Sequence, residues 1–147
     1  MDKSVIISVS AKQSFEDAED ETVELVTEGV LACEGGGDFT LSYQESELTG
    51  MQGTLTTFQV ERQRITLLRM GEYNSQMVFE PGRKHLSYYN TPYGTLSIGV
   101  NTNRMQAALD EHGGQITIDY GIEVDHAMAG RNLFQIDIRE KDSAIKQ

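Results

Sequence analysis

The stretch Tyr89-Asn90-Thr91-Pro92-Tyr93-Gly94, residues 89–94, marks a sharp corner between two strand-like parts of the chain. Pro92 fixes its own φ and favours an extended conformation at Thr91, whereas Gly94 can adopt a positive φ without steric cost. The hexapeptide therefore predicts the end of one strand, a tight turn and the start of the next. It organises a fold, and it indicates no reaction.

Apolar and polar residues alternate on both sides of this corner. Alternation with a period of two is typical of strands that have one buried face. The clearest series is Ile116, Ile118, Tyr120, Ile122 and Val124, and the pattern recurs within 5–9, 39–43, 96–100 and 134–138. Turn residues rich in glycine, proline and asparagine separate the series, so the sequence predicts about eight to ten strands.

Strands with one apolar face must bury that face in a sandwich or a barrel. Turns between nearly all neighbours favour a meander, and closing a meander removes its exposed edges. We therefore expect an all-β protein, a closed antiparallel up-and-down barrel. It forms a single domain over residues 1–147, with an acidic loop at 14–21 and a polar tail at 140–147. The segment Met105–Leu109 is compatible with a short helix and equally with a strand.

Composition and charge disfavour several classes of partner. The chain has 147 residues and a formal net charge of −11, and its basic residues are dispersed. Such a surface repels phosphate backbones and anionic lipid, so we expect neither nucleic acid nor a membrane as partner. The first apolar stretch is too short and too alternating for a signal peptide, and Cys33 is the only cysteine. Both features favour a cytoplasmic location.

The sequence lacks the motifs of common active sites. The three histidines lie far apart without zinc-ligand spacing, Cys33 has no basic neighbour, and no serine lies in a nucleophile elbow. We therefore expect no metal, no cofactor and no catalytic residue, and an enzyme is the least favoured interpretation.

Several motifs together resemble those of a known family. They are Arg69-x-Gly71, Met77-x-Phe79, Gly82, Tyr89-x-Thr91-Pro92-Tyr93-Gly94, Thr102 and Tyr120. In combination they resemble the YwiB-like family of small bacterial proteins. The resemblance implies a calycin-like β-barrel, related in shape to the lipocalins and fatty-acid-binding proteins. It implies no activity, because the family is one of unassigned function.

Arg69 is the most informative polar residue of the predicted barrel. Ile65 and Leu67 share its face, so Arg69 lies inside the barrel or at its mouth if that face points inward. A buried guanidinium needs a partner, and the clearest inward faces offer the hydroxyls of Tyr89 and Tyr120 but no carboxylate. One interpretation is that Arg69 binds the anionic head group of a ligand. The other, which we favour, is that Arg69 lies at the barrel end and bonds turn carbonyls or a rim carboxylate.

Apolar residues with inward parity either line a pocket or fill the core. The set is Phe58, Met77, Phe79, Leu96, Ile98, Ile118 and Phe134. A filled core is the commoner outcome in a small barrel. The candidate ligand-binding residues are Arg69, Tyr89, Tyr120, Thr91, Met77 and Phe79.

Two functions follow as alternatives. The first is a binding module for a small apolar or anionic ligand inside the barrel. The second is a non-catalytic interaction or structural module with a filled barrel, which docks another protein or a second copy of itself. The sequence leaves a homodimer open, with Leu55, Leu68, Tyr88 and Tyr93 as candidates for outward apolar contacts.

Overall fold

The computed structural model describes residues 2–14, 20–46, 52–71, 74–92 and 94–141, and only the backbone of 88–91. Within these ranges the chain forms ten β-strands. They are β1 (Asp2–Ser14), β2 (Glu21–Gly35), β3 (Asp38–Gln44), β4 (Thr54–Val60), β5 (Ile65–Gly71), β6 (Ser75–Phe79), β7 (Lys84–Thr91), β8 (Gly94–Asp110), β9 (Gly113–Val124) and β10 (Ala127–Glu140). No helix in the described residues is long and apolar enough to cross a membrane.

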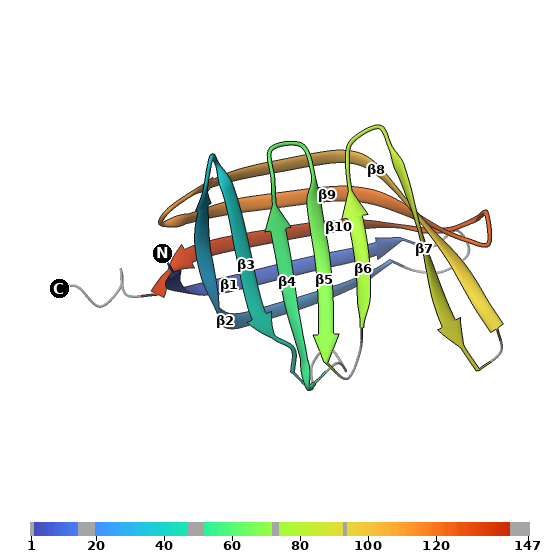
Figure 1. The fold of residues 1–147 in the computed structure, drawn as a ribbon, viewed down its shortest axis with the longest axis horizontal. Coiled ribbons are helices and arrows are strands. Elements are labelled where there is room, and N and C mark those ends of the chain that lie inside the picture. The colour runs from blue at the N-terminus through green and yellow to red at the C-terminus, as the bar shows by residue number, and fades with distance from the viewer. Residues whose placement is uncertain (1, 15–19, 47–51, 72–73, 93, 142–147) are drawn as a thin grey trace.

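The strands form one antiparallel sheet in the order β6-β5-β4-β3-β2-β1-β10-β9-β8-β7. Neighbours in sequence are neighbours in the sheet, except that β1 pairs with β10 and that β6 and β7 are the two edges. The sheet curls so that the shorter strands β3–β6 lie in front of the longer strands β8, β9, β10, β1 and β2 (Figure 1). The predicted all-β up-and-down barrel is confirmed, and it is nearly closed. At the seam, Ser87 Oγ donates a hydrogen bond to the Gln76 carbonyl oxygen at 3.1 Å.

The core consists of the inward-facing residues of this sheet. Ile116, Ile118 and Tyr120 of β9 are buried, as are Ile136 and Ile138 of β10, as their alternation predicts. Because successive side chains of a strand point to opposite faces, the polar residues between them lie on the outer face. The two-residue period therefore decides which alternate residues of each strand face the core.

The apolar set predicted to line a pocket or fill the core is largely inside the barrel. Phe58, Phe79 and Ile118 are buried, and Met77 and Phe134 pack against the core. The remaining two members are Ile98, which is half-buried, and Leu96, which is 37% exposed. For Leu96 the prediction is wrong, because the β7–β8 hairpin extends beyond the body of the barrel there (Figure 1).

Gly29 allows close packing within β2 rather than a bulge. The pairing of β2 with β1 runs without interruption past Gly29, and the pairing of β2 with β3 begins at Gly29. A Cβ atom at Gly29 would overlap the Ile7 side chain and the Ser42 carbonyl oxygen. Glycine is required here because a side chain of β1 and the backbone of β3 approach its Cα closely.

Three local features of strands β8–β10 are not marked by the alternation of apolar residues. Met105–Leu109 is extended and belongs to β8, which shifts its register by a β-bulge between Thr102 and Arg104. The β8–β9 turn is Glu111–His112, and Gly113 and Gly114 already belong to β9 with φ of 129° and 144°. The last turn is confined to residues 125–126. Bulges and two-residue turns leave little trace in hydrophobic periodicity, which explains why the sequence does not locate them.

The expected acidic loop and polar tail lie mostly outside the described residues. β1 continues to Ser14 and β2 begins at Glu21, so both ends of the expected loop belong to strands. β10 continues to Glu140, which pairs with Val5 and is therefore part of the sheet.

Candidate functional site

Arg69 lies on the inward face of β5, at the end of the strand that leads to the β5–β6 turn. It shares that face with the buried residues Ile65 and Leu67, and its own side chain is 19% exposed. Its partner across the β4–β5 pair is Thr56. The Ile65 face therefore points inward, which was the condition for placing Arg69 inside the barrel or at its mouth.

A buried carboxylate lies beside this guanidinium. Glu45 Oε2 is 3.9 Å from Arg69 Nε, and the Glu45 side chain has no exposed surface. The Thr56 hydroxyl donates a short hydrogen bond to the same carboxylate. Among the described residues Arg69 Nε has no hydrogen bond, so its interaction with Glu45 is a long ion pair. The expectation that inward faces offer no carboxylate is thus wrong at Glu45.

Two buried tyrosines accompany the pair. Burial raises the pKa of Tyr43 above its ordinary value, and the negative charge of Glu45 adds to the effect. Burial also raises the pKa of Tyr120 to about 12, although an Asn132 hydrogen bond and the Arg69 charge oppose the increase. The Tyr120 ring packs against Phe79, with ring centroids 4.7 Å apart. At this end of the barrel Tyr43, Glu45 and Tyr120 are buried, and the charge of Glu45 lies beside that of Arg69.

The opposite end of strands β3–β5 is open. A pocket of about 410 Å³ lies between the β2–β3 turn, the β4–β5 turn and the second half of β8. Its lining residues are Gly36, Gly37, Phe39, Val60, Glu61, Arg62, Met105, Ala107 and Leu109. Phe39, Met105 and Leu109 pack against the core and form its apolar wall, whereas Ala107, which shares their inward parity on β8, is exposed.

Arg62 supplies a cation at the rim of this pocket. It is exposed, and no described residue forms a hydrogen bond or an ion pair with it. By contrast, Arg64 and Arg83 of the same barrel end both lie near the Glu80 carboxylate, at 3.8 Å and 3.7 Å. The pocket therefore combines an apolar wall with two charged residues of the β4–β5 turn, Glu61 and Arg62, and Arg62 forms no ion pair with any described residue.

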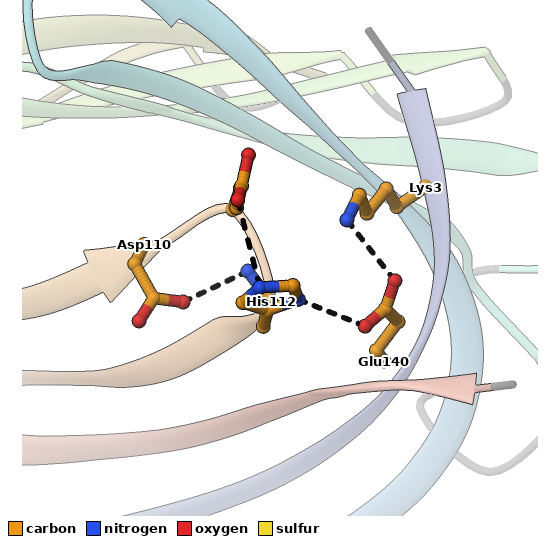
Figure 2. Close-up of polar contacts among 5 residues, drawn as sticks. Lys3, Asp110, His112 and Glu140 are labelled. Atoms are coloured by element: carbon orange, nitrogen blue, oxygen red, sulfur yellow. Dashed lines mark hydrogen bonds and ion pairs between the residues drawn. The ribbon is translucent and has the colours of Figure 1, made fainter. Parts of the chain in front are cut away.

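A surface cluster joins the β8–β9 turn to the ends of β1 and β10. His112 Nδ1 lies 3.0 Å from Glu140 Oε2, and Glu140 Oε1 lies 3.1 Å from Lys3 Nζ (Figure 2). The His112 backbone N–H donates to Asp110 Oδ1 at 2.8 Å. These contacts hold the pKa of Glu140 below its ordinary value, through His112 first and Lys3 second. The cluster contains no nucleophile, and we interpret it as a link between chain segments.

The other predicted site residues divide into three groups. Phe79 is buried and Met77 half-buried, so both belong to the core beside Tyr120. The side chains of Tyr89 and Thr91 lie outside the described residues, and their proposed contacts stay predictions. No three His, Cys, Asp or Glu side chains in the described ranges are arranged to hold a metal ion.

Sequence reasoning missed Glu45 and the pocket at the open end. Glu45 follows Leu41 and Tyr43 at the same two-residue spacing, which indicates its inward orientation, but the alternating series 39–43 ends before it. The pocket depends on where β7 stops pairing with β8, which no local pattern encodes.

Comparison with known proteins supports the fold and assigns no function. Residues 7–136 match the family described as Domain of unknown function (DUF1934). The uncharacterized beta-barrel protein YwiB of Bacillus subtilis (strain 168) is 25% identical over 119 residues, which cover 80% of this chain and 82% of that protein. The crystal structure of the ywiB protein from Bacillus subtilis matches with a TM-score of 0.75 at 20% identity, over 92% of both chains.

Proposed function

The chain belongs to the DUF1934 family, which is a family of unknown function. We propose that it binds a small, partly apolar anion at the open end of its barrel. The observation that carries the proposal is the pocket of about 410 Å³ with Arg62 at its rim. Pockets for small molecules are typically about 300–1,000 Å³, mostly apolar, with a few polar groups that orient the ligand.

The lining residues fit the two parts of such a ligand. Phe39, Met105 and Leu109 offer apolar surface that a hydrocarbon or aromatic part would remove from water. Methionine adapts to ligands of different shape because its side chain is unbranched and flexible. Arg62 would meet the anionic part, and a planar guanidinium suits carboxylate, sulfonate or phosphate oxygens.

The interior around Arg69 offers less to a ligand than its sequence context suggests. Glu45 already lies beside the guanidinium, and an incoming anion would have to approach that carboxylate. Tyr43 and Tyr120 are buried in the adjoining core, and the pocket of about 610 Å³ that Arg69 borders lies on its other neighbours, residues of β5, β6 and β7. The site formed by Arg69, Tyr89 and Tyr120 is therefore the less favoured place for a ligand.

A fluorescence titration with anilinonaphthalene sulfonate, an apolar anion, tests the proposal. Arg62→Glu should weaken binding about three- to tenfold, because it replaces an attraction by a repulsion of similar size. Arg139→Glu is the matched control: it makes the same charge change on the outer face of β10, away from the pocket. Its affinity should equal that of the wild type.

A second variant tests the apolar wall independently of charge. Phe39→Ser removes the aromatic side chain from the β3 side of the pocket and should lower probe affinity by a similar factor. Circular dichroism and the melting temperature show whether the variant is folded. Wild-type affinity in both Arg62→Glu and Phe39→Ser, or no probe binding by the wild type, would contradict the proposal.

The unpaired edge of β8 favours a second candidate function, a non-catalytic interaction module. The two functions are compatible, because the pocket uses side chains and the edge uses main-chain groups.

A further inference from the structure

The second half of β8 is paired on one side only. β7 pairs with β8 from Gly94 to Asn101, whereas β9 pairs with β8 as far as Asp110. Beyond Asn101, the Thr102 carbonyl oxygen accepts a hydrogen bond from the Gly82 N–H at 3.3 Å. In the described residues no further backbone bond crosses to the turns opposite, so 103–110 form a free strand edge.

The register shows which main-chain groups this edge presents. Asp110 and Gly113 flank a two-residue turn, and such flanking residues form a hydrogen-bonded pair. Residues 104, 106 and 108 therefore direct their N–H and C=O groups towards β9. Met105, Ala107 and Leu109 direct theirs away from the sheet. The bulge between Thr102 and Arg104 produces the change of parity, which agrees with the outward Thr102 carbonyl.

The middle of this edge, residues 105–109, lacks the features that usually prevent edge-to-edge association, although the bulge and Arg104 stand at one end of it and Asp110 at the other. Proteins protect free edges with charged residues, proline, short strands or bulges. β6, the edge on the other side of the seam, is five residues long, and its Gln76 carbonyl is bonded by Ser87. On β8, residues 105–109 read Met-Gln-Ala-Ala-Leu and contain neither a charge nor a proline. An edge of this kind indicates that a partner covers it.

We propose that the partner is a second copy of this chain, whose β8 pairs antiparallel with the first along a two-fold axis at Ala107. In this register Ala107 lies opposite the partner's Ala107, and Met105 lies opposite the partner's Leu109. These residues carry the outward N–H and C=O groups, so both strands present their donors and acceptors at the same positions.

The charges flanking the edge are complementary in the same register. Arg104 lies opposite the partner's Asp110, and the symmetry produces this ion pair twice. Arg104 is exposed, and no described residue pairs with it. A register shifted by two residues to either side would place Arg104 or Asp110 opposite an uncharged residue. Charge and main-chain pattern thus select one register.

The pairing goes beyond the proposed ligand binding and does not depend on it. It would bring the partner's Leu109 beside Met105, on the inward face that borders the pocket. Main-chain hydrogen bonds hold the two copies, so Phe39→Ser and Arg62→Glu should weaken probe binding while leaving the association unchanged. The two proposals can therefore fail separately.

Amide hydrogen exchange measured by NMR at increasing protein concentration tests the pairing residue by residue. The amides of Met105, Ala107 and Leu109 should exchange rapidly in dilute protein and become protected as concentration rises. The amides of residues 104, 106 and 108 are the internal control, because their bonds to β9 protect them at every concentration. Rapid exchange at 105, 107 and 109 at all concentrations would overturn the proposal and would indicate that any partner is a different molecule.

A charge-swap series tests the register. Arg104→Asp alone places two aspartates opposite each other and should shift the concentration for half-association upwards by at least tenfold, as measured by sedimentation equilibrium. Asp110→Arg alone should do the same through paired arginines, and the double variant should recover wild-type association. Melting temperatures check folding, since Asp110 also accepts the His112 N–H bond. Association that ignores the single variants, or a double variant as weak as either, would refute this register.

Discussion

The two ends of strands β3–β5 differ in whether their charged and main-chain polar groups have partners within the protein. At the end beside the β5–β6 turn, Glu45, Thr56 and Arg69 are inside the barrel, and the protein supplies both charges of the pair. At the other end, Arg62 forms no ion pair with a described residue beside an open pocket, and the second half of β8 is paired on one side only. The first end can be called the internal end and the second the open end.

This difference separates groups that are buried from groups that are available. A buried charge is conspicuous in a sequence because burial demands a partner, but the chain can supply that partner itself. The capacity to bind another molecule lies where a charge, an apolar wall and main-chain donors are left unpaired. In this barrel those features coincide at the open end.

The largest expected effect concerns the internal end. Glu45→Ala leaves Arg69 without its carboxylate and should lower the free energy of unfolding by about 3–5 kcal/mol, measured by urea denaturation. The double variant Glu45→Leu with Arg69→Met replaces both charges by apolar groups and should lose much less. A Glu45→Ala protein as stable as the wild type would show that the pair is not a structural element.

Enlarging a side chain should lower stability at the internal end and hardly at the open end, and this effect should be smaller than that of Glu45→Ala. Gly29→Ala places a methyl group against the Ser42 carbonyl oxygen and should cost about 1–3 kcal/mol. At the open end, Ala107→Val adds two methyl groups beside a pocket and should change stability by less than about 0.5 kcal/mol. Equal losses in the two variants would remove the distinction between a packed and an open end.

Alkaline pH should destabilise the internal end. The pKa of Tyr120 is raised to about 12 in the folded protein, so the unfolded chain loses the tyrosine proton first as pH rises. The stabilisation is complete below the unfolded pKa of about 10 and disappears between the two values, with a slope of up to about 1.4 kcal/mol per pH unit. Tyr120→Phe should show a shallower loss in unfolding experiments across this range. An identical slope in the wild type and Tyr120→Phe would contradict the assignment of Tyr120 to a buried environment.

The smallest effect is expected at the surface cluster beside the open end. The pKa of Glu140 is lowered by His112 and Lys3, so its contribution to stability is present above the unfolded value of about 4.3 and is lost as pH falls through the folded pKa (Figure 2). Glu140→Gln should therefore lose less stability than the wild type on acidification. Parallel acid transitions of the two proteins would show that the cluster contributes nothing.

Much of the fold follows from the two-residue period. The alternation from Ile116 to Tyr120 predicts a strand with the correct inward face, and the same parity places Arg69 inside the barrel. Inward orientation propagates along a strand, so a few apolar residues fix the face of all the others. The corner at Pro92 and Gly94 likewise separates β7 from β8, and Gly94 has a φ of 125°.

The features of the candidate site were less predictable, because they depend on contacts between distant segments. Glu45 lies just beyond the end of β3, where turn-like composition outweighed the parity it shares with Tyr43. The free edge of β8 exists because β7 begins only at Lys84, opposite Asn101, and no local pattern sets the length of β7. The bulge after Thr102 then reverses the face of every later residue, which alternation alone does not reveal.

The most direct test of the central contrast is an NMR titration of the protein with anilinonaphthalene sulfonate, with chemical-shift changes assigned to residues. If the open end is the binding end, the largest changes should lie at Phe39, Met105 and Leu109, while Tyr120 and Arg69 stay unchanged. Changes concentrated at Tyr120 and Arg69 would instead place the ligand at the internal end and contradict the account.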